Sequence, residues 1–242
     1  MEDVKKHQVK ITYEKLFWLF VIGSFVGVII EGSFCLIAKG HWESHVLTLV
    51  GQFNALYGAG AVLFYSIIAL LHNKKTITKV VVITIVATIL EYLCGVLLSD
   101  VLGMKAWDYS SSFLNYRGII CLNFTLGWGA AGLVFCIFFN KINRFLSKFQ
   151  SKKWNVACIV LSVFMAVNLS LTAASIYRWS ERHYGVAANT KIDVIIDNLT
   201  PDEWMQKRFV DWSFLKNDAD KKPNKQIQKG EAKLQNEINS TF

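Results

Sequence analysis

Residues 79–99 read KVVVITIVATILEYLCGVLLS, and this stretch decides the fold class. After the first lysine, its only charged side chain is Glu91. A helix of twenty residues rises by roughly 30 Å, which matches the thickness of the hydrocarbon core of a bilayer. Only helices and closed barrels satisfy their backbone hydrogen bonds in lipid, and an apolar run without alternation is not a barrel strand. The stretch therefore predicts a transmembrane helix.

Four more runs share this apolar character. The composition agrees, because 53% of the residues are hydrophobic and only 18% are charged, too few to cover a soluble domain. We predict an all-α polytopic membrane protein, with a bundle of five transmembrane helices within residues 16–179. The expected spans are 16–38, 47–71, 79–99, 119–140 and 155–177. A signal peptide is the alternative for the first span, but its core is too long and no small-residue cleavage site follows it.

The distribution of Lys and Arg predicts the orientation. Residues 1–15, the loop 72–79 and the loop 141–154 carry four, three and five basic residues, whereas the opposite short loops carry only Lys39, Lys105 and Arg117. The positive-inside rule then places the segment 1–15 in the cytoplasm and, with five spans, the C-terminus outside a plasma membrane. The net charge of +8 is expected to meet anionic membrane lipid, and no nucleic-acid partner is expected.

The segment after the last span changes character. Residues 180–215 hold Thr200 and Pro201 ahead of Glu203, a pattern that predicts a helix start with Thr200 as the N-cap. Aromatic side chains that include Trp204 and Phe209 make this an amphipathic juxtamembrane segment, expected to lie on the membrane or over the outer mouth of the bundle. Residues 216–242 are almost without apolar side chains and are predicted to be disordered.

Polar residues inside the predicted spans lie at similar depths. Counted inward from the outer helix ends, Glu31 and Glu91 lie roughly 12 Å deep, Asn54 about 10 Å and Asn123 about 8 Å. Ionisable groups inside a bilayer are costly and usually face the bundle interior or a wet cavity. We interpret these residues as one polar layer in the outer leaflet. The alternative is that they only form hydrogen bonds between helices, as we expect for Asn168 of the last span.

The loop at the mouth of the fourth span carries the other candidate groups. Residues 105–129 read KAWDYSSSFLNYRGIICLNFTLGWG. Arg117 is the cation nearest to the polar layer, and we expect its fork to point inward, to pair with Glu31, Glu91 or Asp108 or to hold an anionic ligand or lipid phosphate. The alternative is an interfacial anchor loop capped by Asp108. The predicted ligand-binding residues are Glu31, Asn54, Tyr57, Glu91, Trp107, Asp108, Tyr109, Asn115, Arg117 and Asn123.

The remaining motifs exclude several classes of chemistry. All five cysteines fall within predicted spans without a C-x-x-C pair, so no disulfide framework is expected. His41 and His45 lack an evident third ligand, and neither a metal nor another cofactor is predicted. The chain contains no P-loop, which excludes nucleotide hydrolysis through that motif. It also lacks G-x-S-x-G, the usual signature of serine hydrolases.

Several short elements together resemble a known family. They are Leu90-Glu91-Tyr92, the AWDYS run 106–110, N-x-x-G-x-I-C-L at 115–122 and Gly127-Trp128-Gly129, with Glu31, the YGAGA run 57–61 and R-W-x-E-R at 178–182. In combination they are similar to the bacterial family catalogued as putative ABC-transporter type IV permeases, over residues 15–210. One departure is that LTLVGQFNA stands before Tyr57, where the family has an Arg-Gly and a Gly-Pro-x-Cys-Pro-Ile run. The resemblance implies a membrane fold and an association with transport.

Two classes of function are consistent with these features. The first is a permease-like or solute-binding membrane subunit with a polar cavity open to the outside, and a separate ATPase subunit that would dock on the basic loop 141–154. The alternative is an intramembrane enzyme that acts on a lipid or lipid-linked substrate from the extracytoplasmic face. We favour transport, because the sequence shows no evident pair of nucleophile and base.

Overall fold

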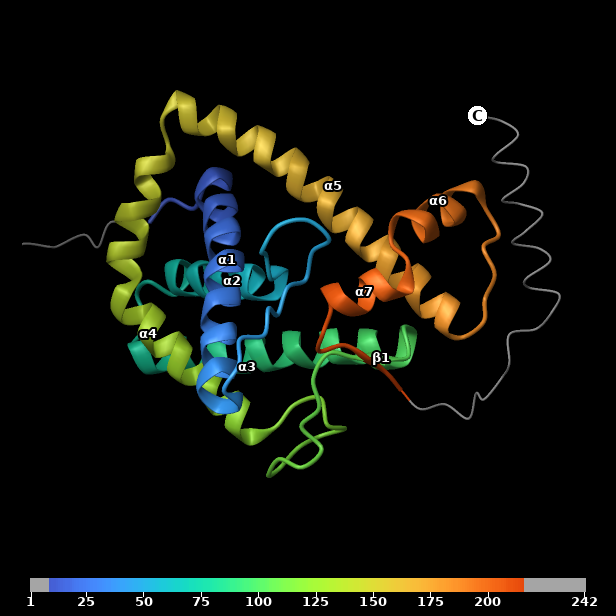
Figure 1. Cartoon of the computed structure of the whole chain (residues 1–242). Coiled ribbons are helices and arrows are strands. Elements are labelled where there is room, and N and C mark those ends of the chain that lie inside the picture. The colour runs from blue at the N-terminus through green and yellow to red at the C-terminus, as the bar shows by residue number, and fades with distance from the viewer. Residues whose placement is uncertain (1–8, 216–242) are drawn as a thin grey trace, which may run out of the picture.

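The computed structural model describes residues 9–215, and the predicted disorder of residues 216–242 lies outside this range. Its fold is all-α apart from two short strands (Figure 1). The helices are α1 (Tyr13–Lys39), α2 (Ala55–Leu70), α3 (Thr76–Val96), α4 (Leu122–Leu146), α5 (Lys152–His183), α6 (Lys191–Leu199) and α7 (Asp202–Arg208). A π-helical turn, η1 (Leu97–Val101), extends α3, and a 3₁₀ turn, η2 (Ser147–Phe149), follows α4.

Within residues 9–215, four helices are long and apolar enough to cross a membrane, namely α1, α3 with its η1 extension, α4 with η2, and α5. At most a third of the most apolar window of each helix is buried inside the protein. The exposed apolar surface is what a helix surrounded by lipid requires. The apolar helix α2 has only 16 residues, about 24 Å at 1.5 Å per residue, so the structure establishes four candidate spans rather than the predicted five.

Helix α1 begins and ends where local signals dictate. The hydroxyl of Thr12 accepts a hydrogen bond from the amide of Lys15 at 3.4 Å, which caps the first turn. At the other end Gly40 adopts a left-handed conformation, with φ of 79°, and its amide donates to the carbonyl of Leu36. A residue with a side chain is strained in this conformation, so the glycine ends the helix.

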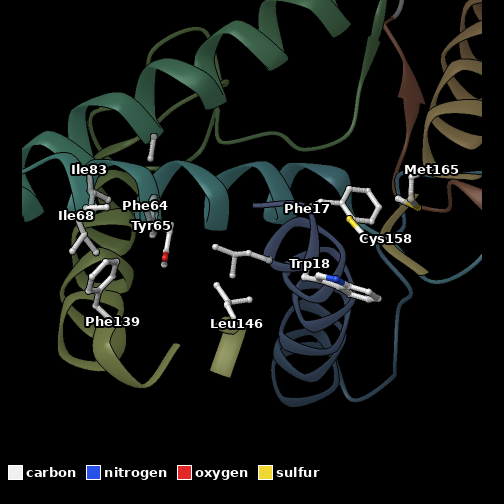
Figure 2. Close-up of a cluster of buried hydrophobic side chains, with 13 residues drawn as sticks. Phe17, Trp18, Phe64, Tyr65, Ile68, Ile83, Phe139, Leu146, Cys158 and Met165 are labelled. Carbon is white, nitrogen blue, oxygen red and sulfur yellow. The ribbon is translucent and has the colours of Figure 1, made fainter. Parts of the chain in front are cut away.

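Helices α1 and α2 pack closely because glycines face each other. A methyl group added at Gly58 would lie 2.6 Å from the carbonyl oxygen of Phe20 and would overlap the hydroxyl of Ser24. Further along the same two helices, Phe17 and Trp18 of α1 join Phe64, Tyr65 and Ile68 of α2 in the main apolar core. Figure 2 shows that Phe139 and Leu146 of α4 complete this cluster. In Figure 1, α1 crosses α2 and α3, so the helices do not form a single parallel bundle.

The prediction of one continuous helix over residues 47–71 is wrong in its first part. Residues 47–54 have no helix, and α2 begins only after Asn54, whose amide donates to the carbonyl of Ser24 in the middle of α1. Side chains of α5 satisfy the irregular backbone: the Asn168 amide exchanges two hydrogen bonds with Val50, at 2.9 and 3.1 Å. The hydroxyl of Thr172 accepts from the amide of Leu49 at 2.9 Å. Asn168 therefore links α5 to the irregular segment 47–54.

The C-terminal segment forms a cap packed on α5. Strand β1 (Met104–Lys105), after α3, pairs antiparallel with β2 (Ser213–Phe214). A second apolar cluster packs Met104 of β1 against Trp179 of α5, Met205 of α7 and Phe209. We call residues 191–215 the C-terminal cap. Two of its residues, Asp211 and Trp212, line a cavity between the helices, and whether the segment also lies on a membrane stays a prediction.

The predicted N-cap at Thr200 is wrong by one residue. Thr200 ends α6, where its buried hydroxyl donates to the carbonyl of Ile196, and Pro201 takes the N-cap position of α7. The helix that follows is α7, which begins one residue later than predicted, and a capping box forms instead at Thr190, with Asp193, at the beginning of α6. The same T-x-x-acid spacing occurs at both places, but only at Thr190 do both hydrogen bonds form.

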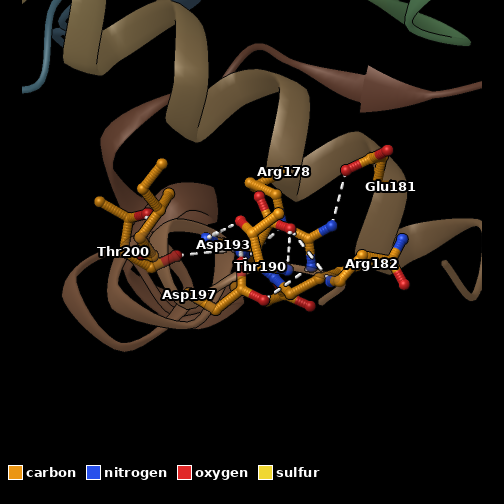
Figure 3. A network of polar contacts seen from close by, with 10 residues as sticks. Arg178, Glu181, Arg182, Thr190, Asp193, Asp197 and Thr200 are labelled. Atoms are coloured by element: carbon orange, nitrogen blue, oxygen red, sulfur yellow. Dashed lines mark hydrogen bonds and ion pairs between the residues drawn. The ribbon is translucent and has the colours of Figure 1, made fainter. Parts of the chain in front are cut away.

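An ion-pair network fastens the cap to α5 (Figure 3). Arg178 is 2% exposed, and its Nε and Nη2 donate to the two carboxylate oxygens of Asp197 at 3.0 and 2.7 Å. Its Nη1 donates to Glu181 at 2.6 Å, and Arg182 joins from the outside by pairing with Asp197 and Asp202. Such bidentate contacts fix geometry as well as charge.

Candidate functional site

A cavity of about 240 Å³ lies where the ends of several helices meet the loops. Its walls come from α1 to α4, the loop 40–54, the loop 106–121 and the C-terminal cap. Six of the ten predicted site residues line it: Glu31, Asn54, Tyr57, Glu91, Trp107 and Tyr109. The sequence argument from matched depth thus brings both glutamates to one cavity.

Glu91 is the buried charged group of this cavity. It is 5% exposed, and its two oxygens accept hydrogen bonds from the phenol of Tyr109 at 3.2 Å and the indole of Trp128 at 2.9 Å. Both donors are neutral, and within the described part of the chain no Lys or Arg lines the cavity. Burial and the charge of Glu91 raise the pKa of Tyr109, so this phenol stays protonated and keeps donating.

Asn54 and Tyr57 reach the cavity from the start of α2. Asn54 is buried and caps the helix, because its side-chain oxygen accepts from the amide of Leu56 at 3.1 Å. Its side-chain nitrogen donates to the carbonyl of His45 at 2.9 Å, which ties α2 to the loop before it. Tyr57 packs directly on Gly27 of α1, where any added side chain would collide with the ring.

The loop 106–121 holds its shape through its own polar side chains. Asp108 accepts from the amide of Ser110 at 2.9 Å and pairs with Lys105 at 2.5 Å, and these bonds lower the pKa of Asp108 to about 2. Asn115 donates to the carbonyls of Ser110 and Ser112, both at 3.0 Å. Asp108 and Asn115 therefore build the loop, as the cap interpretation expects for Asp108, and neither lines the cavity of Glu91. Trp107 reaches that cavity while its indole donates to the carbonyl of Ile119 at 2.8 Å.

The expectation that Arg117 points at the two glutamates is wrong. Its guanidinium pairs with Asp100 of η1 at 2.5 Å on the exposed side of the loop. Arg117 and Asp108 line a second cavity, also of about 240 Å³, on the other side of Trp107. Asp100 lies on the turn that extends α3, just beyond the predicted span 79–99. Asn123 is exposed on α4 and lines neither cavity.

Sequence reasoning missed the residues that close the remaining wall. Trp128, His45, Asp211 and Trp212 all line the cavity of Glu91. Trp128 lies in the G-W-G element that supports the family resemblance, so a signal for it was present. For Asp211 there was none, since it approaches from the far end of the chain.

His45 lies at the centre of a group of acidic side chains. Its Nδ1 bonds to Asp211 and lies 3.6 Å from Glu31, while its Nε2 lies 3.4 Å from Glu43 and 3.1 Å from the thiol of Cys35. The hydrogen bond to Asp211 is the largest cause of a raised pKa of His45, burial opposes it, and the nearby carboxylates add to it. The bond joins the C-terminal cap to the loop 40–54.

Comparison with known proteins identifies a family but no individual relative. No curated protein and no solved structure matches this chain. One family model matches residues 18–173, from the start of α1 to the middle of α5, which includes most of the cavity wall but not Asp211 and Trp212. The match spans more than half of the chain, so this protein belongs to the family described as "Putative ABC-transporter type IV".

Proposed function

We propose that this chain is the solute-binding membrane subunit of a transporter, and that the cavity of Glu91 accepts an organic cation. The observation that carries the proposal is the lining of this cavity. A buried carboxylate, Glu91, lies among the aromatic rings of Tyr57, Trp107 and Trp128, and no lysine or arginine of residues 9–215 lines the cavity. Carboxylates and aromatic faces together recognise ammonium groups, since both attract positive charge.

The energetics of Glu91 favour a cationic partner. A carboxyl group this deeply buried is stable either as the neutral acid or with a positive charge bound against it. Two neutral donors orient its oxygens, which leaves the charge itself to be balanced by the ligand. Glu31 and Asp211 add further carboxylates to the same wall.

The irregular segment 47–54 supports a transport role. In membrane proteins, non-helical backbone at membrane depth is tolerated where it is buried in protein or lines a cavity, and discontinuous helices of this kind form solute sites in transporters. Here the loop lines the cavity at Leu47 and Asn54, and α5 supplies its backbone hydrogen bonds. On this proposal the short helix α2 completes a fifth, interrupted span.

Orientation and partner follow from the same proposal. The basic residues place residues 1–15 and the α4–α5 turn in the cytoplasm of a bacterial cell, so the cavity and the C-terminal cap face the outside of the plasma membrane. The family name implies a separate ATPase subunit. Lys141, Arg144, Lys148 and Lys152 around the α4–α5 turn are the docking surface we propose for it. Co-purification of an ATPase that is lost on replacing these four residues by Gln tests this part.

Binding of a matched pair of probes tests the solute class. The full-length protein in detergent is titrated with choline and with 3,3-dimethylbutanol, its neutral isostere, and the fluorescence of the cavity tryptophans is recorded. We expect choline to bind at least tenfold more tightly, because a desolvated cation–π contact is worth about 2 kcal/mol before the carboxylate contributes. Glu91→Gln should abolish this preference, and Glu14→Gln, at the opposite end of α1, is the control. Equal affinity for both probes, or binding of neither, would refute an organic-cation site.

A further inference from the structure

Three side chains of the types that bind metal ions meet at His45, which lines the cavity. Cys35 lies in the last turns of α1, and Glu43 and His45 lie in the loop that follows. Their ligand atoms all lie within 4.8 Å of one another, with the thiol 3.1 Å and the Glu43 carboxylate 3.4 Å from Nε2 of His45. We propose that Cys35, Glu43 and His45 together bind one divalent transition-metal ion, and that Zn²⁺ fits this donor set best.

The separations are close to those that a zinc ion imposes. Bonds of 2.0–2.3 Å in a tetrahedron place neighbouring ligand atoms about 3.3–3.8 Å apart. The two distances to His45 already lie near this range, and the thiol and the Glu43 carboxylate lie within 4.8 Å of each other. A thiolate with an imidazole and a carboxylate suits Zn²⁺ and related borderline ions, whereas Mg²⁺ and Ca²⁺ prefer oxygen alone. Three protein ligands leave a fourth position for water or solute.

Asp211 supplies the support that metal-binding histidines usually have. It bonds to Nδ1, the ring nitrogen on the side away from Cys35 and Glu43. A carboxylate on one ring nitrogen fixes the proton there and directs the lone pair of the other nitrogen at the metal. The imidazole of His45 is therefore oriented with Nε2 toward both other ligands. The C-terminal cap, which carries Asp211, would tune the affinity of a site whose ligands all lie elsewhere.

A different chemistry uses the same alignment of groups. A thiol beside an imidazole that is oriented by a carboxylate is also the arrangement of a cysteine nucleophile with its base. A nucleophile must meet its substrate, but Cys35 is 3% exposed and does not line the cavity. A metal ion needs only the three donor atoms, so the geometry favours a ligand role for Cys35. This inference does not depend on the cavity binding an organic cation.

Cobalt spectroscopy tests the site directly. The full-length protein, purified in detergent with an affinity tag that contains no histidine, is titrated with Co²⁺, which reports a thiolate ligand by a charge-transfer band in the near ultraviolet. We expect one equivalent of Co²⁺ to produce the band and Zn²⁺ to displace it. Cys35→Ser and His45→Gln should abolish the band, whereas Cys94→Ser, a helix cysteine outside the group, should retain it. Asp211→Asn should weaken binding by about 10- to 100-fold.

A measurement on the unsubstituted protein guards against variants that fail to fold. Alkylation of each cysteine is followed by mass spectrometry with and without Zn²⁺, and Zn²⁺ should slow the reaction of Cys35 at least tenfold while leaving Cys94 unchanged. Absence of the cobalt band, or a band that survives Cys35→Ser, would overturn the proposal. Rapid alkylation of Cys35 that is insensitive to Zn²⁺ and lost in His45→Gln would also overturn it, and would assign Cys35 as an activated nucleophile.

Discussion

Replacing Asp197 by asparagine should release the C-terminal cap from α5. Asp197 accepts two hydrogen bonds from the buried guanidinium of Arg178, at 3.0 and 2.7 Å, and a third from Arg182 at 2.5 Å (Figure 3). The amide of asparagine keeps the size of the side chain but removes its charge and one acceptor oxygen. Arg178, 2% exposed, then keeps Glu181 as its only acidic partner among the described residues.

The magnitude follows from what remains. Removing one partner of a buried ion pair costs about 3–5 kcal/mol. Because Glu181 still pairs with Arg178, we expect a smaller cost, about 2–3 kcal/mol, for the opening of the cap. Asp202 is the matched control: it belongs to the same network, but its side chain is 58% exposed and pairs only with Arg182. Asp202→Asn should cost less than about 1 kcal/mol, as exposed ion pairs usually do.

Hydrogen exchange of the amides in residues 191–208 measures this opening. A cost of 2–3 kcal/mol corresponds to roughly 30- to 160-fold faster exchange for Asp197→Asn, against less than about sixfold for Asp202→Asn. Adding Arg178→Met to Asp197→Asn should recover part of the loss, because the buried guanidinium that has lost its bidentate partner is gone. If the two single variants exchange equally fast, or if the double variant is no better than Asp197→Asn, the network does not hold the cap.

Three further predictions concern packing, the irregular loop and orientation. Gly58→Ala should lower the thermal stability in detergent by about 1–3 kcal/mol, because its methyl group would overlap α1. Gly60→Ala, with open space around it, is the control and should change the stability by less than about 0.5 kcal/mol. Equal effects of the two substitutions would contradict the close packing of α1 and α2. Asn168→Leu should cost about 1–3 kcal/mol for each backbone group of Val50 left without a partner, and an unchanged unfolding temperature would show that the loop does not need this side chain. A cysteine at Ser110, in a chain whose native cysteines are replaced, should react with an impermeant maleimide on intact cells; labelling only after permeabilisation would reverse the proposed orientation.

The apolar runs predicted most of the helices because lipid tolerates few alternatives to a helix. Helices α1, α3, α4 and α5 begin and end within a few residues of the expected spans at one or both ends, and the differences arise from caps and turns such as Gly40. The segment 47–54 differs although its composition is similar. Its backbone bonds to Asn168 and Thr172, more than a hundred residues away, and such partners leave no local signal.

The depth of polar residues within the helices predicted which glutamates line the cavity, but it did not predict the ion pairs that the loop residues form. Glu31 and Glu91 line one cavity because a carboxyl group inside a span must face the protein interior. The same argument predicts that Arg117 pairs with these glutamates. In the structure it pairs instead with Asp100, on the π-helical turn that extends α3. Ion pairs of an exposed arginine differ little in free energy from one acidic partner to another. The conformation of the loop therefore determines which acid pairs with Arg117, and residue spacing does not predict that conformation.

The cap has a further consequence for the site. Asp211 lies beyond residue 173, where the family match ends, yet it lines the cavity and bonds to His45. The groups that carry most of the cavity, including Glu31, Glu91 and Trp128, lie within the match. A carboxylate bound to Nδ1 raises the basicity of the other ring nitrogen and fixes its direction, so in the proposed metal site the C-terminal segment would tune His45 without supplying a ligand itself. A ligand that prefers the oriented imidazole also stabilises the closed cap, and full opening of the cap weakens that ligand by the same free energy that the ligand contributes to closure. Asp197→Asn should therefore weaken such a ligand only as far as it populates the open cap.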